Sequence, residues 1–447
     1  MGGGSVLTAS FILFFVMVAA ALASGLSVAW ALLGGLVLFW LLGLRQGFSS
    51  RTLWEMAWNK CKKSLIVVTV IALIGVITGL WRMSGTIAYC IVKGVELVTP
   101  RLFLVIAFLL CAALSYVLGT SYGVSSTMGV ILMALARSGG VSPVVTAGVV
   151  LSGVYFGDRC SPASSAASLV AAVTETDLYR NVRQMLRTGL LPTLLALALY
   201  TLLSFRHPIT GLDSGVLSAL TDHFAMSWTV LLPAVVMFVL PLFKAPIKAA
   251  MGASIAVAAV LGIAVQGFSL TEVAQAAWSG YHPQDPKLAA VLDGGGVTSM
   301  ASSYVIVLLT GLYSGILEGT GNLRPLSGRA EALAARIGRF PAMIAVSTLC
   351  AAALCNQAVT SMMGEQLLGR AYDSREELAM DIENSGIMIA GLIPWSIACS
   401  IPLAMLGADI RALPYAALLW LTPLCYLFTK RHFYPEKGPQ ISNEVKS

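Results

Sequence analysis

The sequence predicts an all-α polytopic membrane protein made of two inverted-topology repeats, with broken helices and re-entrant segments. Three observations support this prediction. The chain is strongly apolar, short motifs recur in the same order in its two halves, and equivalent loops of the halves differ in charge.

The composition is that of a membrane protein. Of 447 residues, 57% are hydrophobic and 11% are charged, and the mean hydropathy is +0.83, whereas about 25% of the residues of a soluble domain are charged. Crossing a bilayer takes roughly 20 apolar residues. Uncharged runs of about that length include Val6–Ser24, Leu26–Leu44, Ser64–Trp81 and Leu102–Leu118. With the interrupted runs we expect about a dozen crossings, in the cell (inner) membrane.

The net charge of +7 does not indicate a nucleic-acid partner. Many basic residues lie in short loops between apolar runs, which is the positive-inside pattern of membrane proteins. The eight cysteines show no paired spacing of the kind that binds a metal or forms a disulfide framework. The expected partners are the lipid bilayer and a small-molecule or ion substrate, and no cofactor is expected beyond Na⁺ as a coupling ion. Whether the chain forms a homodimer is left open.

Three motifs recur between the halves. ITGLWRMSGTI (77–87) aligns with YSGILEGTGNL (313–323), and LGTSYGVSS (118–126) aligns with LCNQAVTSM (354–362), both at a spacing of 236 residues. PASSAASL (162–169) aligns with PWSIACSI (394–401) at a spacing of 232 residues. Three matches in the same order indicate a duplication.

Loop charge predicts that the two copies are inverted. The loop 45–63 is strongly basic and its counterpart 271–297 is mildly acidic, whereas 82–100 has little net charge and its counterpart 323–340 is basic. Equivalent loops therefore favour opposite sides of the membrane. The predicted divisions are a first repeat at 1–205, a linker at 206–225, a second repeat at 226–429 and a cytoplasmic tail at 430–447.

Four apolar runs are interrupted by Gly, Pro and clustered hydroxyl residues, at 119–127, 157–168, 355–361 and 383–400. Such breaks are tolerated in a membrane where protein or a water-filled cavity surrounds them, and they present carbonyls, hydroxyls and helix ends to ions or small polar solutes. In PASSAASL and PWSIACSI the shared residues alternate, which favours short extended stretches facing a cavity. Close helix packing by small residues is the structural alternative. The expected substrate-binding residues are Thr120, Ser121, Ser125, Ser161, Ser164, Ser165, Ser168, Asn356, Gln357, Thr360, Ser361 and Ser396.

Ionisable residues inside the membrane are candidates for ion coupling. The candidates are Asp158, Glu318 and Glu383, together with the neighbouring amide Asn384. An ion pair between Asp158 and Arg159 at a membrane boundary is the alternative to a coupling role for Asp158.

At the interrupted runs the sequence resembles the NhaC family of sodium/proton antiporters. LGTSYGVSSTMGV, TAGVVLSGVYFGDRCSP and TETDLYRNVRQML look like the first-half signature of that family, and ENSGIMIAGLIPWS looks like its second-half signature. The resemblance implies exchange of Na⁺ for H⁺, or coupling of these ions to organic acids or other small solutes.

Three carboxylates that the family pattern leads us to expect are neutral here. Ser165 stands in place of an Asp, Asn356 stands where the family has Asp-Gln, and Asn384 stands where it has Glu-Asp-Ser-Gly. Hard cations prefer oxygen ligands that include charged ones. Na⁺ is expected near Ser165 and Asn356, but weakly bound.

These observations favour an ion-coupled (Na⁺ or H⁺) secondary transporter or antiporter for a small polar organic solute, such as an amino acid or a carboxylate. Arg159 would offset an anionic group of that solute. The alternatives are a simple Na⁺/H⁺ antiporter and a channel. An enzyme is not expected, because no His or Lys base lies near the membrane serines in the sequence.

Overall fold

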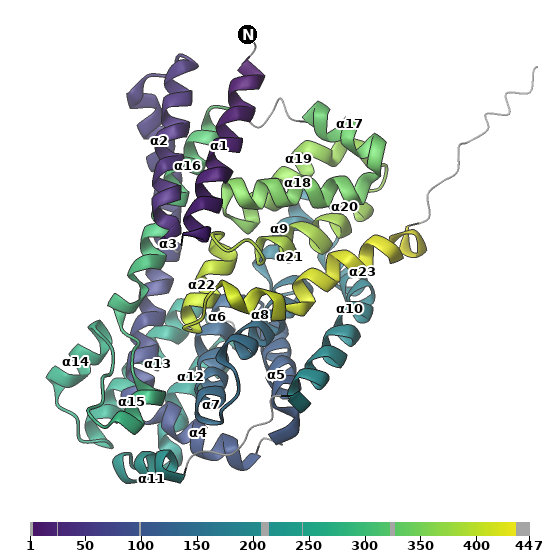
Figure 1. The fold of residues 1–447 in the computed structure, drawn as a ribbon. Helices are drawn as coiled ribbons and strands as arrows, with labels where there is room; N and C mark the ends of the chain where they lie inside the picture. The colour runs from purple at the N-terminus through teal and green to yellow at the C-terminus, as the bar shows by residue number, and fades with distance from the viewer. Residues whose placement is uncertain are drawn as a thin grey trace, which may run out of the picture.

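The computed structural model describes residues 3–24, 26–97, 100–206, 214–243, 245–321 and 327–434. In this part of the chain helices form throughout, and the single bridge, between Tyr281 and Gly294, is isolated and builds no strand. Figure 1 shows the arrangement. The predicted all-α class is confirmed.

The first half contains α1 (Gly3–Ala23), α2 (Val28–Arg45), α3 (Ser50–Met83), α4 (Thr86–Leu97), α5 (Phe103–Leu118), α6 (Ser121–Val124), α7 (Val130–Ser138), α8 (Pro143–Cys160), α9 (Ser165–Thr174) and α10 (Leu178–Arg206). The rest of the chain contains α11 (Ser214–His223), α12 (Leu232–Leu242), α13 (Ile247–Ala264), α14 (Leu270–Trp278), α15 (Pro286–Leu292), α16 (Ala301–Gly319), α17 (Ser327–Ile337), α18 (Arg339–Leu354), α19 (Gln357–Leu368), α20 (Arg375–Ile382), α21 (Met388–Ala390), α22 (Ile397–Met405) and α23 (Ala417–Phe433). The π-helical segments η2 (Ser125–Gly129) and η7 (Glu383–Ile387) join α6 to α7 and α20 to α21.

The helices that are long and apolar enough to cross a membrane alone are fewer than the sequence led us to expect. Within the described residues three helices meet this criterion, and two bent pairs bring the number to five. Other apolar helices, such as α5 and α18, are shorter. The dozen crossings expected from the sequence therefore cannot all be unbroken helices, because much of the apolar sequence forms broken helices.

The predicted divisions differ from the helices at two places. The linker 206–225 contains α11, while residues 207–213 lie outside the described part of the chain. The expected tail does not begin at residue 430, because α23 continues to Phe433 and Lys430 packs inside the protein. The remainder of that tail, 435–447, also lies outside the described residues.

Equivalent helices of the two halves run antiparallel. Along α16, Gly311 packs on Cys61 of α3, whereas Gly315 packs one turn earlier on Ala57. These glycines follow the spacing that lets membrane helices approach closely. Because α3 and α16 carry the aligned motifs 77–87 and 313–323, their antiparallel packing is that of inverted repeats.

The breaks in the two halves have matching backbone conformations. Gly119 ends α5 with φ 65° and ψ 27°, and Cys355 ends α18 with φ 52° and ψ 23°. Ser164 and Ser396 precede α9 and α22 with φ −70° and −67°, and each side chain caps its helix. The duplication read from the motifs thus recurs in the backbone.

The predicted extended stretches are wrong. Ser165–Thr174 and Ile397–Met405 are helical, so only the short turns before Ser164 and Ser396 depart from helix. The alternating small residues arise because a capping Ser and a Ser one turn later fall four positions apart, as in Ser164 and Ser168.

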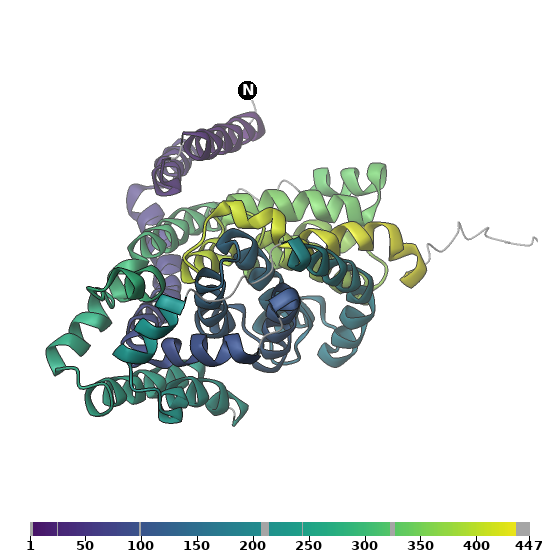
Figure 2. The ribbon, with the colours of Figure 1, turned by 60° about the horizontal axis from the view of Figure 1, so that its bottom comes forward.

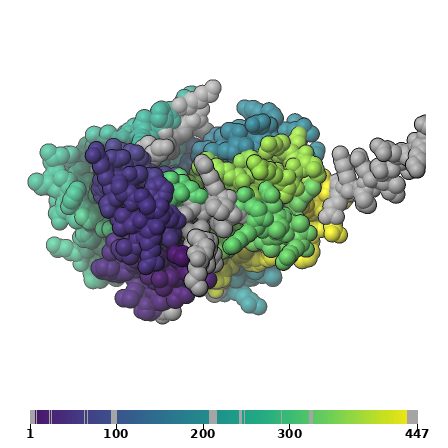
Figure 3. Space-filling view, turned by 90° about the horizontal axis from the view of Figure 1, so that it is seen from above, coloured from purple at the N-terminus to yellow at the C-terminus, as the bar shows by residue number. Residues whose placement is uncertain are grey.

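The basic loops lie at one end of the molecule. Lys60 of α3 bonds Glu318 near the end of α16, which brings the basic stretch 45–63 to the end where α17 follows. Most of this predicted loop is the helical start of α3. This end is at the top of Figure 1 and faces the viewer in Figure 3, with the purple α1–α2 hairpin on one side and green α17–α19 on the other. By the positive-inside rule it is the cytoplasmic end. The opposite end, with α11, α14 and α15, comes forward in Figure 2.

Replacing Gly119 by Ala should destabilise the protein. Its left-handed conformation costs a non-glycine residue about 1–2 kcal/mol, and an added Cβ would lie 2.4 Å from the carbonyl carbon of Ala163. We expect a clear fall in the thermal unfolding temperature in detergent. Cys355→Gly is the matched control, because it relieves the same strain and loses only the weak contacts of Sγ with Tyr313 and with the carbonyl of Ala352. Equal losses in both variants would contradict the equivalence of the two breaks.

Candidate functional site

The broken segments of the two halves interlock at the centre of the molecule. Within the first half, Gly119 lies against the backbone of Ala163, and within the second, the N–H of Ile397 donates to the carbonyl of Cys355 at 2.9 Å. Across the halves, α9 packs on α19, and α22 packs on α6 and η2. Each half therefore contributes one pair of breaks to a common centre.

Asp158 lies between the first residues of two helices that begin at these breaks. It is 6% exposed, and its Oδ2 accepts from Nε2 of Gln357, the first residue of α19, at 3.2 Å. Ser121, the first residue of α6, directs its backbone N–H and its hydroxyl to the same carboxylate. Helix N-termini stabilise negative charge. The structure thus brings together three predicted residues from both halves.

Arg159 is a buried cation whose hydrogen-bond partners are neutral. It is 2% exposed, and its Nη2 donates to Oδ1 of Asn384 at 2.6 Å, to Oγ1 of Thr188 at 2.8 Å and to the carbonyl of Met185 at 3.1 Å. Its Nε is buried without a partner, and no ion pair joins it to a carboxylate in the described part of the chain. The predicted alternative, an ion pair with Asp158, does not form. A buried charge of this kind needs a partner to be stable.

Glu383 is a buried carboxyl beside these two residues. It is fully buried in η7, and neither carboxyl oxygen has a hydrogen-bond partner among the described residues. It lies within electrostatic range of Arg159 and Asp158. Arg159 compensates part of its negative charge, but a buried carboxylate without hydrogen bonds still costs several kcal/mol, so Glu383 is suited to bind a cation or a proton. π-Helical segments such as η7 occur frequently at functional sites.

Many predicted hydroxyl and amide residues serve their own helices. Thr120, Ser164, Asn356 and Ser396 each accept a hydrogen bond at a helix start. The hydroxyls of Thr360, Ser361 and Ser168 donate to carbonyls one turn earlier, and that of Ser161 accepts from the N–H of Ala163. In contrast, the hydroxyl of Ser125 is buried without a partner. Local capping therefore explains much of the hydroxyl pattern, as expected for broken helices.

The geometry does not build a Na⁺ site around Ser165 and Asn356. Ser165 is exposed at the start of α9, and Oδ1 of Asn356 already accepts from the N–H of Val359 at 3.2 Å. No hydrogen bond joins the two residues in the part of the chain that the structure describes. A Na⁺ at this place stays a prediction. The carboxylates of Asp158 and Glu383 offer better oxygen ligands for Na⁺.

Glu318 lies outside the central site. Its carboxylate accepts from Nζ of Lys60 at 2.7 Å, where α16 meets α3 near the cytoplasmic end. The aligned position, Arg82, lies at the opposite end of α3. This separation follows from inverted topology and makes Glu318 a packing residue of the α3–α16 contact.

Replacing Glu318 by Gln should leave ion exchange within about twofold of the wild type, because partly exposed ion pairs contribute about 0–1 kcal/mol. The measurement is the initial rate of exchange by the purified protein in proteoliposomes. A loss of exchange as large as that expected for Asp158→Asn would indicate that Glu318 takes part in ion coupling.

A second buried ionic cluster was not predicted. Lys430 bonds Asp381 at 2.5 Å and Glu377 at 2.7 Å, and Arg339 bonds Glu377 at 3.3 Å. Tyr372 donates to Asp381 at 2.6 Å. The cluster fixes α20, which leads directly into η7, to α18 and α23. No signal in the sequence indicated this burial, because Lys430 is followed by Arg431 and His432, and Asp381 lies between Glu377 and Glu383.

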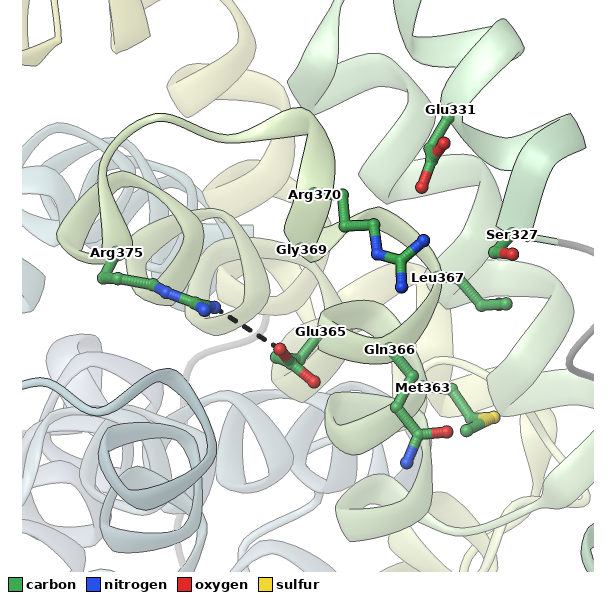
Figure 4. Close-up of a pocket in the computed structure, with 9 residues that line it drawn as sticks. All are labelled: Ser327, Glu331, Met363, Glu365, Gln366, Leu367, Gly369, Arg370 and Arg375. Carbon is green, nitrogen blue, oxygen red and sulfur yellow. Dashed lines mark hydrogen bonds and ion pairs between the residues drawn. The ribbon is translucent and has the colours of Figure 1, made fainter.

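A pocket opens at the cytoplasmic end, beside the C-terminal half of α19. Its volume is about 450 Å³. Figure 4 shows Arg370 and Glu331 at its wall and the ion pair of Arg375 with Glu365, at 3.4 Å. Its four charged residues balance, two basic against two acidic.

Comparison with known proteins identifies the family. A family model described as "Na+/H+ antiporter family" matches residues 4–167 and 153–429, which is most of the chain. The chain belongs to this family. The resemblance to the NhaC family, first recognised in motifs such as GDRCSP and LIPWS, is confirmed.

Curated relatives of this antiporter match over nearly full length. The chain is 26% identical over 425 residues to a malate-2H⁺/Na⁺-lactate antiporter of Bacillus subtilis, covering 90% of each chain. It is 27% identical to the arginine/ornithine antiporter ArcD of Halobacterium salinarum, covering 89% of this chain and 86% of the relative. It is 25% identical to the Na⁺/H⁺ antiporter NhaC of Alkalihalophilus pseudofirmus, covering 83% and 84%.

These findings make the protein an ion-coupled antiporter and a multi-pass integral protein of the cell membrane. The family is one of transporters. Among the described residues no group of three or more His, Cys, Asp and Glu side chains is arranged to hold a metal ion. The family description gives Na⁺ as an exchanged ion.

Proposed function

We propose that this antiporter exchanges a small organic solute bearing a carboxylate for Na⁺ or H⁺, at the centre formed by Asp158, Arg159, Glu383 and Asn384. The observation that carries the proposal is the buried guanidinium of Arg159, whose partners are all neutral. A guanidinium binds a carboxylate through two parallel hydrogen bonds.

The neutral residue at position 384 supports this choice of solute. The resemblance leads us to expect a carboxylate there, 2.6 Å from Arg159. Such a carboxylate would satisfy the arginine from within the protein. With Asn384 the positive charge stays available for an anionic group of the solute, and the relatives named for malate, lactate and amino acids carry such groups.

The carboxyls of Asp158 and Glu383 would bind the coupling ion. Asp158 faces two helix N-termini and Gln357, while Glu383 has no partner. Binding the solute carboxylate at Arg159 adds a negative charge beside these groups, and loading Na⁺ or H⁺ compensates it. Antiport requires that the two loaded forms alternate, and the pairs of breaks from the inverted halves supply the elements that would move.

Transport in proteoliposomes tests this function. We expect vesicles loaded with Na⁺ at low internal pH to take up labelled L-malate, L-lactate or L-arginine faster when the ion gradient is imposed than when it is collapsed. Plain Na⁺/H⁺ exchange is the second candidate, because a relative named NhaC covers most of the chain. A Na⁺-driven pH change without uptake of any solute would select that candidate and overturn the proposal.

A further inference from the structure

A cavity of about 240 Å³ lies at the end of the molecule opposite the basic loops. It is lined by the last turns of α3, α7 and α22 and by the glycine-rich loop 293–300. By the positive-inside rule this is the outer face. The cavity is smaller than the roughly 300–1,000 Å³ of drug-sized sites, so it suits a small solute.

Two arginines line this cavity. Arg82 donates from Nη1 to the carbonyl of Thr78 at 2.8 Å, and its Nε is buried without a partner. Arg137 donates from Nη2 to the carbonyls of Leu406 and Gly407 at 3.3 Å. The hydrogen bonds of both guanidinium groups therefore go to neutral backbone carbonyls, and each group keeps further N–H donors.

The acidic residue of the cavity wall is engaged elsewhere. Asp293 accepts from Nδ1 of His282 at 2.6 Å on the exposed loop, and this hydrogen bond raises the pKa of His282 above its usual value. When His282 is protonated it offsets part of the charge of Asp293, which also acts electrostatically on Arg82. Two guanidinium groups then face one cavity with at most one carboxylate between them, and their mutual repulsion is relieved when an anion binds.

The cavity has a counterpart in the other repeat. Three of its lining residues, Val130, Met133 and Ala134, align at the spacing of 236 residues with Gln366, Gly369 and Arg370, which line the cytoplasmic pocket. The two spaces thus occupy equivalent places in inverted halves, one at each face. They differ in charge, because the cytoplasmic pocket has two acidic residues against its two arginines.

We propose that Arg82 and Arg137 form a carboxylate-binding site at the outer mouth of the antiporter, distinct from the central site. It captures a small mono- or dicarboxylate before the solute reaches Arg159. The choice of a carboxylate rests on the proposed function, whereas the excess of positive charge in the outer cavity does not. Capping of the α22 end by Arg137 is the purely structural alternative.

Equilibrium binding of labelled L-malate to the purified full-length protein tests this site. The central site is first removed with Arg159→Gln, and Arg82→Gln is then added. We expect the single variant to bind L-malate and the double variant to bind it at least about tenfold more weakly, because it loses a charge-assisted hydrogen bond to the carboxylate. Arg82→Lys in the same background should restore part of the affinity. Equal affinities of the single and double variants, or no binding by the single variant, would overturn the outer site.

Transport then shows on which face the arginine acts. In oriented proteoliposomes, Arg82→Gln should raise the KM for external L-malate about tenfold and leave the KM for internal L-malate unchanged. Arg375→Gln in the cytoplasmic pocket is the matched control and should not change the external KM. Equal changes of both KM values for Arg82→Gln would indicate a structural role and overturn the proposal. If the wild type transports no carboxylate while the binding results hold, the proposed function fails and the outer site stands.

Discussion

Asp158→Asn is expected to reduce exchange at least about a hundredfold with the fold intact. The substitution preserves the shape of the side chain and removes the charge that faces Gln357 and Ser121. Asn has no charge with which to bind Na⁺ or H⁺, and a hydrogen bond to a charged group contributes about 1.5–3 kcal/mol. Losing two such bonds fits a hundredfold effect, because each 1.4 kcal/mol corresponds to a factor of ten. The initial rate of ion and L-malate exchange in proteoliposomes measures the effect.

Asp177→Asn provides the matched control. Asp177 is exposed and accepts from the N–H of Arg180 at the start of α10. An Asn caps a helix about as well as an Asp, so exchange should be unchanged. If the two variants exchange at equal rates, Asp158 does not hold the coupling ion.

Asn384→Asp is expected to weaken binding of the solute and to strengthen binding of Na⁺. The new carboxylate would lie 2.6 Å from Nη2 of Arg159 and would form the ion pair that is absent in this chain. The solute carboxylate then loses its partner, so the KM for L-malate should rise at least about tenfold. The affinity for Na⁺ should increase, because a hard cation gains a charged oxygen nearby. Both quantities come from the dependence of exchange on L-malate and on Na⁺.

Asn384→Ala separates charge from structure. It removes the bond from Arg159 and the bond from Nδ2 to the carbonyl of Met380, at 2.8 Å, without adding a carboxylate. We expect a smaller rise of the KM for L-malate and no gain in Na⁺ affinity. The same KM in the Asp and Ala variants would mean that the charge of Arg159 does not bind the solute.

The breaks were predictable from the sequence because their causes are local. Gly119 adopts a left-handed conformation, and Ser164 and Ser396 cap the helices that follow a proline-containing turn. These preferences belong to the residues themselves. Inversion was predictable because loop charge depends on the side of the membrane rather than on packing.

The partners of ionisable residues were not predictable in the same way. Glu318 pairs with Lys60 across 258 positions and Arg159 bonds Asn384 across 225 positions, so each contact depends on how α3, α8, α16 and η7 pack. The prediction of an extended stretch was wrong because serines four positions apart also suit a helix cap and the next helical turn. Sequence reasoning could name candidate residues but could not say which of them touch.

A cryo-EM structure of the antiporter with saturating L-malate in Na⁺-free buffer tests the central claim most directly. The account predicts density for the solute in contact with the guanidinium of Arg159, next to Asp158 and Asn384 at the meeting point of the four breaks. An unoccupied centre in protein that exchanges L-malate under the same conditions would contradict it.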